Sequence, residues 1–462
     1  MLAPEQVYDG SQWRVIGVST APPSTPGEGG LSALVTNTEL STWQDRAVSG
    51  PWRETGDVST NSPGYWTRSD EWSMLTASTY DWSQDRWDGQ TSGGASHRTS
   101  RRLADAALVA LINDDEQLAD DVFDELIAQR NMFETETGWV SEGGWNDGDG
   151  QPGGFPLAIR MGWWLDAYLT LTSMGYSSQS ILDWHNAYAH VNKDELQSAL
   201  NSPFPNRLSG DYSSRASWVD LGAEHDDGRD AWETSQGTVR GPRITRWYNN
   251  RRMTMAGHVG LAAAATGDET LRHHFETFCY ELVAFGFRLD GLHGDYHRGS
   301  PGAAQTPVTY TWHGLELMVP AMEALARQGH TGSYDITTTD GSGGPGGTQD
   351  GTRTMEDLFH SAVQWVVGHS EERYFVGHFN DPLFRLWSLT DNGDVAIWDS
   401  TILYASNYFN RPDWRDIIYR SNVPTELEWT PGFRVNSSLR QTQTDHRMRF
   451  RFVDHNPYGE ST

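Results

Sequence analysis

The stretches that decide the fold are residues 261–271, LAAAATGDETL, and residues 108–118, LVALINDDEQL. Each reads as an alanine- or leucine-rich helix, a short acidic turn and the start of a second, amphipathic helix. In both stretches the acidic residues fall where the second helix begins, and carboxylates are favourable at that end of a helix dipole. The two stretches therefore predict one type of helical hairpin that occurs at least twice in the chain.

Further helical patterns lie between and after these two hairpins, at residues 156–172, 178–191, 308–327 and 353–367. No strict period of about 34 to 47 residues recurs, which argues against a regular solenoid. Repeated helical hairpins without such a period favour a ring of helix pairs. The predicted fold class is mainly α, an incomplete (α/α) toroid of helical hairpins.

The composition divides the chain into three parts. Residues 1–95 are rich in Gly, Pro, Ser, Thr and Trp, lack a helical period, and are interpreted as an irregular segment that serves as an attachment region. Within them, residues 7–16 predict a short hairpin around Asp9 and Gly10. Residues 96–420 form the predicted toroid and catalytic domain. Residues 421–462 form a small β-rich tail, because arginines and apolar residues alternate over residues 447–452.

The overall charge is strongly acidic. The chain has 462 residues, with 62 Asp and Glu against 34 Lys and Arg, a net charge of −28, and Lys193 is the only lysine. Such a surface suits a very salty environment, because salt screens the repulsion between like charges. A net negative charge argues against nucleic acid as a partner, since nucleic-acid binding depends on neutralising phosphates.

Other classes are excluded by what the sequence lacks. Cys279 is the only cysteine, so an internal disulfide framework and a cysteine-based zinc site are excluded. No apolar run reaches the roughly 18 to 20 residues that span a bilayer. Residues 1–10 have neither a basic nor an apolar region of the kind found in secretory signals. We nevertheless expect an extracellular site of action.

One local reversal of charge stands out in this acidic chain. Five arginines surround an aromatic and amide segment, residues 247–250: Arg240, Arg243, Arg246, Arg251 and Arg252. Guanidinium groups bind carboxylates through two parallel hydrogen bonds, so the run predicts an anion-binding cleft. The alternative is that these arginines pair with the acidic stretch at residues 224–227.

A second constellation precedes and enters the helix predicted at 308–327. Its members are His, Tyr, Arg and Asp side chains within a short span: His293, Asp295, Tyr296, His297, Arg298, Tyr310 and His313. A single His is more often structural than catalytic, but three beside Arg and Tyr favour a site as much as a structural role.

These two segments resemble the alginate-lyase-like polysaccharide lyases over roughly residues 97–370. Asn249-Asn250-Arg251, which opens an alanine-rich helix, is similar to the Asn-Asn-His segment of that family. His297-Arg298-Gly299, followed by Tyr310, is similar to the family's Arg-Gly segment and its downstream catalytic Tyr. The resemblance implies an α/α toroid with a long cleft for an acidic polysaccharide.

The chain departs from the family pattern at two places. Arg251 stands where the family has His, which removes one candidate base. The interval from Arg298 to Tyr310 is longer than the family's, through residues 300–306, and Tyr296 is the alternative to Tyr310.

The resemblance implies a β-elimination that removes the C5 proton of a uronate and expels the oxygen at C4. Asn250, together with Asn249, would donate hydrogen bonds to the carboxylate, and Arg298 or Arg251 would add positive charge. Tyr310 would act as the acid or as the base, and His297 is the second candidate base. The predicted catalytic residues are thus Asn250, His297, Arg298 and Tyr310. The predicted substrate-binding residues are Asn249, Arg246, Arg251, Trp247, Tyr248, Tyr296 and His293. No metal or other cofactor is required by this scheme.

Several alternatives stay open at this point. A glycoside hydrolase on the same architecture would need paired carboxylates, for which Asp147, Asp149 and Asp295 are candidates. A virion tail or surface protein that binds or degrades a host glycan would fit the character of residues 1–95, and assembly in a virion or a homo-oligomer would accompany it. Residues 146–150 begin like a calcium loop but lack its Glu at the twelfth position, so we interpret them as a turn. Trp163 and Trp164 would either pack in a helical core or line sugar subsites.

Overall fold

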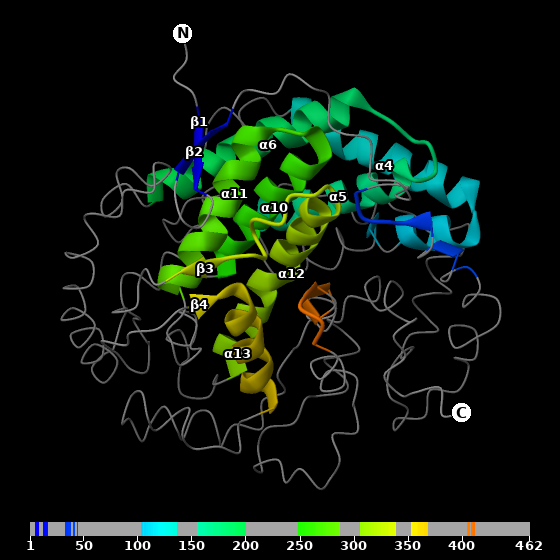
Figure 1. Cartoon of the computed structure of the whole chain (residues 1–462). Helices are drawn as coiled ribbons and strands as arrows, with labels where there is room; N and C mark the ends of the chain where they lie inside the picture. Colours follow the sequence, from blue (N-terminus) through cyan, green and yellow to red (C-terminus); the bar gives the residue numbers. More distant parts are fainter. Residues whose placement is uncertain are drawn as a thin grey trace, which may run out of the picture.

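The computed structural model describes a set of separate ranges of the chain. These are residues 5–8, 13–16, 33–37, 40–41, 44, 103–104, 106–135, 155–199, 248, 250–286, 305–338, 353–367, 404–406 and 408–411. This part of the protein is mostly helical, which confirms the prediction of a mainly α chain (Figure 1). The predicted β-rich tail at 421–462 lies outside the described residues.

The helices agree closely with the sequence patterns. They are α4 (Glu116–Thr135), α5 (Phe155–Thr172), α6 (Gln179–Ala199), α10 (Asn250–Thr266), α11 (Glu269–Glu281), α12 (Gln305–Arg327) and α13 (Met355–Val367), with a π-helical segment, η4 (Leu282–Gly286), directly after α11. The four helical patterns predicted at 156–172, 178–191, 308–327 and 353–367 are confirmed by α5, α6, α12 and α13.

The described strands form two short antiparallel ribbons. The predicted hairpin at residues 7–16 is confirmed by β1 (Glu5–Tyr8) and β2 (Trp13–Ile16), in which Tyr8 pairs with Trp13. The second ribbon joins β3 (Thr337–Thr338) to β4 (Arg353–Thr354). Arg353 is buried and donates to the carbonyl oxygen of Ala284 over 3.0 Å, which ties β4 to the π-helical segment η4.

The repeated hairpin is confirmed in atomic detail. Asp114 and Gly267 occupy equivalent places in the two copies, and both have left-handed backbone conformations, with φ of 53° and 70°. The next residue caps the second helix in each copy: Asp115 Oδ1 accepts from the backbone N–H of Leu118 over 3.0 Å, and Asp268 Oδ1 accepts from that of Leu271 over 3.1 Å. Such caps satisfy N–H groups that have no partner inside a helix.

Two more helices end in a left-handed residue. Gly175, with φ of 91°, follows α5, and Gly329, with φ of 90°, follows α12. In the loop after α5 the N–H of Tyr176 donates back to the carbonyl of Leu171, and after α12 the N–H of His330 donates to that of Leu325. This C-terminal motif ends a helix sharply and turns the chain. The described hairpins therefore share one way of reversing direction.

Helix α10 lies at the centre of the described helices (Figure 1), in contact with α5, α6, α11 and α12. Most of its residues are buried, and several are Ala or Gly, which lets neighbouring helices approach closely. Its broadest contact is with α12. The two helices run parallel, because Gly314 lies against Asn250 near one end and Gln328 Nε2 donates to the carbonyl oxygen of Ala264 over 2.8 Å near the other.

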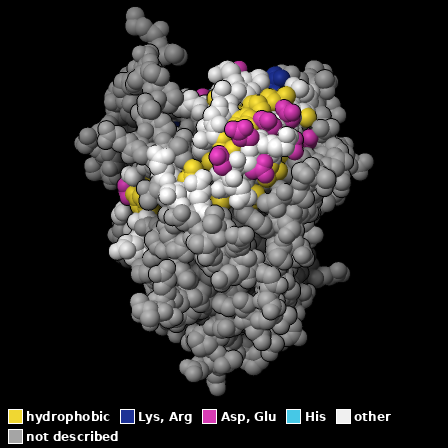
Figure 2. All heavy atoms as spheres, turned by 90° about the vertical axis from the view of Figure 1, so that its right-hand side faces the viewer, with side chains coloured by type: hydrophobic (Ala, Val, Ile, Leu, Met, Phe, Trp, Pro, Cys, Tyr) yellow, Lys and Arg dark blue, Asp and Glu magenta, His cyan; other side chains and the backbone are white. Residues whose placement is uncertain are grey.

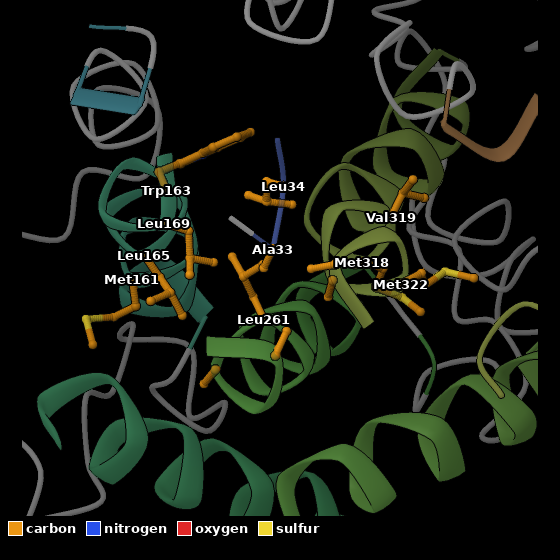
Figure 3. Packing of buried hydrophobic residues seen from close by; sticks show 14 of the residues in the cluster. Ala33, Leu34, Met161, Trp163, Leu165, Leu169, Leu261, Met318, Val319 and Met322 are labelled. Carbon is orange, nitrogen blue, oxygen red and sulfur yellow. The ribbon is translucent and has the colours of Figure 1, made fainter. Parts of the chain in front are cut away.

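Part of the segment predicted to be an attachment region packs inside this core. Ala33, Leu34 and Val35 are buried, the latter two fully. Figure 3 shows Leu34 between the side chains of α5 and those of α12. Arg327 Nη1, at the end of α12, donates to the carbonyl oxygen of Leu34 over 3.0 Å. A boundary at residue 95 would therefore separate part of the core from the helices it packs against.

The burial of Leu34 leads to a prediction for stability. Leu34→Ala should lower the free energy of unfolding by about 2–5 kcal/mol, because it removes a fully buried side chain and leaves a cavity. The control is Leu40→Ala, at a half-buried position in the same region, where a loss of about 1 kcal/mol is expected. Urea unfolding of the full chain measures both. Equal losses in the two variants would contradict the core role of Leu34.

Acidic side chains gather on the outer face of α4. Figure 2 shows Asp and Glu side chains interspersed with apolar ones on the face that includes this helix. Glu116, Asp120 and Asp124 are exposed there, and Asp121 is half-buried. Asp120 Oδ1 accepts from the hydroxyl of Tyr176 over 2.5 Å, and burial together with this bond raises the pKa of Tyr176 to about 12. The like charges spaced three and four residues apart repel one another.

This repulsion predicts a dependence of stability on salt. Raising KCl from about 0.1 M to about 1 M shortens the Debye length from about 10 Å to about 3 Å and should raise the thermal midpoint. Asp124→Asn should stabilise the protein by a few tenths of a kcal/mol at low salt and reduce the response to KCl, since it removes one repelling charge. Thermal unfolding followed by circular dichroism measures both effects, and a midpoint independent of KCl would contradict the interpretation.

Candidate functional site

The start of α10 coincides with the Asn-Asn-Arg segment. Asn250 is the first residue of the helix and is buried, at 3% exposure. Arg251, the second residue, is half-buried. The first N–H groups of a helix have no partner within it, so this end carries a partial positive charge that favours anions. The predicted amide and guanidinium side chains thus stand at an end of α10 that is suited to a carboxylate.

Tyr248 contributes to the core under this helix start. Its side chain is fully buried and its hydroxyl donates to Glu281 Oε2, at the end of α11, over 3.3 Å. Its ring packs against Phe278 with centroids 5.8 Å apart. Because Gly286 has no side chain, its backbone lies close to the ring: a Cβ there would come within 2.7 Å of the Tyr248 Cβ. Tyr248, one of the predicted substrate-binding residues, thus lies in the core beneath the start of α10.

Helix α12 contains Tyr310, another predicted site residue, and contacts the start of α10. A Cβ on Gly314 would lie 3.1 Å from the Cα of Asn250 and 2.7 Å from Met253 Sδ, so the two backbones are nearly in contact. Tyr310 belongs to α12, four residues before Gly314 and about one helical turn nearer the start of the helix. The structure therefore brings positions 250 and 310 to neighbouring turns of two parallel helices.

The remaining predicted site residues cannot be placed in the same way. The residues outside the described ranges are Asn249, Arg246, Trp247, His293, Tyr296, His297 and Arg298, together with the hydrolase candidates Asp147, Asp149 and Asp295. The turn at residues 146–150 and the acidic stretch at 224–227 lie outside them too. Trp163 and Trp164 are each 1% exposed, so they pack in the core and do not line a surface subsite.

A polar cluster that sequence reasoning missed lies between α6 and α10. His185 Nδ1 of α6 is 3.3 Å from His258 Nε2 of α10, and Asn192 Nδ2 of α6 is 3.2 Å from His258 Nδ1. All three side chains are essentially inaccessible to solvent. Trp184 packs on the ring of His185, and Tyr188 on the ring of His258, with centroids 4.8 Å and 5.5 Å apart. Burial lowers the pKa of His258 to about 3 and that of His185 well below its usual value, so both imidazoles are neutral.

Within the described ranges, three further kinds of feature bear on possible ligands: metal-binding clusters, membrane-spanning helices and reactive thiols. They contain no group of three or more His, Cys, Asp or Glu side chains placed to hold a metal ion. No helix among them is long and apolar enough to cross a membrane. The thiol of Cys279 is buried, and burial raises its pKa well above the usual value, which leaves it an unreactive packing group.

The close contact of α10 and α12 yields a prediction. Gly314→Ala should lower the free energy of unfolding by about 1–3 kcal/mol, because the new methyl group meets the backbone of Asn250 and forces the helices apart. Gly332→Ala is the comparison, since the atoms nearest to a methyl group there belong to the Glu276 carboxylate, at 3.0 Å, and not to a helix backbone. Denaturant unfolding measures the free energy of unfolding of both variants. A Gly314→Ala variant as stable as the Gly332→Ala variant would show that α10 and α12 can accommodate a methyl group between them.

No family model matches the chain, and neither the curated proteins nor the solved structures contain a match to it.

Proposed function

We propose that the protein is a polysaccharide lyase that cleaves a uronic-acid-containing polymer by β-elimination. The observation that carries the proposal is the contact of Asn250, at the start of α10, with Gly314 of α12, which follows Tyr310 by four residues. Asn250 and Tyr310 are two of the positions at which the chain resembles alginate-lyase-like enzymes, and they lie 60 residues apart in sequence.

The chemistry needs a neutralised carboxylate before the C5 proton can be removed. In the proposed complex the amide of Asn250 donates a hydrogen bond to the uronate carboxylate, and the positive end of α10 and Arg251 add to its stabilisation. Donors fixed in a buried setting are effective because they need little reorganisation during the reaction. The burial of Asn250 at 3% exposure supports such a fixed position.

Proton transfer is assigned to the α12 side of the site. Tyr310 is proposed as the group that removes the C5 proton or protonates the leaving oxygen at C4. Arg298 and His297 precede the first residue of α12, Gln305, by seven and eight positions, and we propose that they complete the site from that connection. Asn249, Arg246, Trp247, Tyr296 and His293 are proposed to bind neighbouring sugars of an anionic polysaccharide.

The described hairpins also support the larger architecture of the proposal. In two hairpins the first helix, α5 or α10, is almost entirely buried, and the second, α6 or α11, has a partly exposed face. Parallel buried helices such as α10 and α12 follow when each hairpin returns the chain to the same end. We propose that this arrangement continues into an incomplete (α/α) toroid, with the cleft at the end where α10 and α12 begin.

A polyuronate panel tests the proposal at low and high KCl. The new C4–C5 double bond gives an ultraviolet absorbance that hydrolysis does not produce. Asn250→Ala and Tyr310→Phe should each lower kcat by about 10²-fold or more, since each removes a group that acts in the transition state. The matched controls are Asn131→Ala and Tyr176→Phe, at an exposed and a half-buried position away from the start of α10, and they should retain wild-type rates.

Two outcomes would overturn the proposal. Release of reducing ends without the absorbance would identify a hydrolase. Full lyase activity in both Asn250→Ala and Tyr310→Phe would show that the reaction takes place elsewhere on the chain.

A further inference from the structure

The two imidazoles buried between α6 and α10 have no part in the proposed elimination, yet one of them, His258, belongs to the helix that carries Asn250. The amide Nδ2 of Asn192 can only donate, so His258 Nδ1 accepts. The proton of His258 is then on Nε2 and is donated to His185 Nδ1. Asn192, His258 and His185 therefore form a directed chain of two hydrogen bonds across the helix interface.

Small side chains form a large part of the buried surface of α10, beside the larger Met253, Met255, Val259 and Leu261. Ala256, Gly257, Gly260 and residues 262–264 present small side chains, which slide past neighbours more easily than large ones. A shift of one residue along a helix moves every side chain by about 1.5 Å and turns it by about 100°. A buried polar residue with a specific partner is a well-attested means of fixing the register of packed helices.

We propose that Asn192, His258 and His185 form a latch that fixes the register of α10 against α6, which makes His258 a positioning residue for Asn250 at the start of the same helix. Asn250, Thr254 and His258 are spaced four residues apart and are all buried, so they lie along one side of α10. Any slip or rotation at His258 is transmitted along the rigid helix to Asn250. The inference rests on the proposed function only for the role given to Asn250.

The same geometry makes the latch sensitive to acid. An added proton on His185 would occupy Nδ1, opposite the Nε2–H of His258, and two donors would then face each other. An added proton on His258 would occupy Nδ1 and face the amide NH₂ of Asn192, unless that amide turned over. Either proton also places a charge in an apolar interior, and a buried charge without a partner is strongly unfavourable.

Among the described residues, no carboxylate forms a hydrogen bond or ion pair with either ring. On α6 the titratable group that contacts His258, besides His185, is the neutral Tyr188. The buried carboxylates on the other helices packed against α10 are Asp166 on α5, Glu281 on α11 and Glu316 on α12, and none of these three forms a hydrogen bond or ion pair with His185 or His258. Burial accordingly lowers the pKa of both rings.

The direction of the pH effect follows from the lowered pKa values. An unfolded His has a pKa near 6.5, and that of His258 in the folded protein is about 3. The unfolded chain therefore binds protons that the folded chain does not bind. As a result, the free energy of unfolding decreases as the pH falls below about 6.5 toward the folded pKa of His258. Above that pH both states are neutral and the latch is fully effective.

The test compares the full-length wild type with three variants. His258→Gln keeps an acceptor for Asn192 and a donor for His185 but cannot be protonated. His258→Leu removes both hydrogen bonds. Val259→Ala, at the next buried position of α10, is a control that creates a cavity without touching the latch.

Unfolding measured between about pH 4 and 7 tests the latch without reference to activity. For each unit by which the pH is lowered, the folding equilibrium constant of the wild type should decrease by a factor about ten times larger than that of His258→Gln. The reason is that the variant takes up one proton fewer on unfolding. Val259→Ala should be destabilised at every pH but keep the wild-type slope. Equal slopes in the wild type and His258→Gln would overturn the latch.

Turnover on the active polyuronate at neutral pH, below the unfolding temperature of all variants, tests the positioning role. His258→Leu should lose at least about tenfold in kcat, since displacements near 1 Å disturb catalysis strongly, whereas His258→Gln and Val259→Ala should keep most of it. A wild-type kcat in His258→Leu would overturn the positioning role. If the wild type cleaves no polyuronate, the proposed function fails, and the unfolding experiment still decides on the latch.

Discussion

The near contact between the backbones of α10 and α12 is the constraint on which the rest of the candidate site depends. Gly314 has no side chain, and a Cβ in its place would lie only 3.1 Å from the Cα of Asn250. Two helices that touch in this way cannot rotate or slide independently, because protein interiors are close-packed and have few voids. The relative positions of residues 250 and 310 are therefore set by backbone geometry, and not by long side chains that adapt to each other.

Helix α10 is largely buried, and its position is set by contacts with several neighbouring helices. Gly260 faces α11, where a Cβ would come within 2.6 Å of the Phe275 ring, and Gly314 of α12 presses on the opposite end of the helix. The contact with α6 is polar and passes through His258. Steric contacts limit how far α10 can move, whereas hydrogen bonds have direction and select one rotation. The two kinds of contact are complementary, which explains why polar groups are tolerated in an otherwise apolar core.

The sequence predicted the hairpins because the signals that make them are local. The turn residues Asp114 and Gly267 and the capping residues Asp115 and Asp268 lie within a few positions of the helices they end or begin. The strand pairing around Asp9 and Gly10 is local for the same reason. Such features depend on backbone conformation and on neighbours in the chain, so a pattern of residue types is enough to locate them.

The features that the sequence did not reveal depend on contacts between distant residues. His185 and His258 are 73 positions apart, and nothing near either one marks it as buried. Leu34 lies in a region whose composition indicates no core, yet it bonds through its carbonyl to a residue 293 positions away. Tyr248 adjoins a run of arginines in the sequence, and its hydroxyl is directed to Glu281 in the interior. Composition describes a neighbourhood in sequence, and burial is decided by neighbours in space.

The net charge of −28 and the proposed anionic ligand appear to conflict, and the range of electrostatic forces resolves the conflict. Repulsion between an acidic protein and an acidic polymer acts over the Debye length, which is about 10 Å at 0.1 M salt and about 3 Å at 1 M. Hydrogen bonds from the start of α10 act at about that shorter distance and persist when long-range forces are screened. A site built from a helix start, a fixed amide and guanidinium groups is therefore suited to bind an anion in concentrated salt. In dilute salt the negative field of the whole chain would oppose the binding of an anion at this site. The acidic surface and the local donors are therefore both suited to a salty environment.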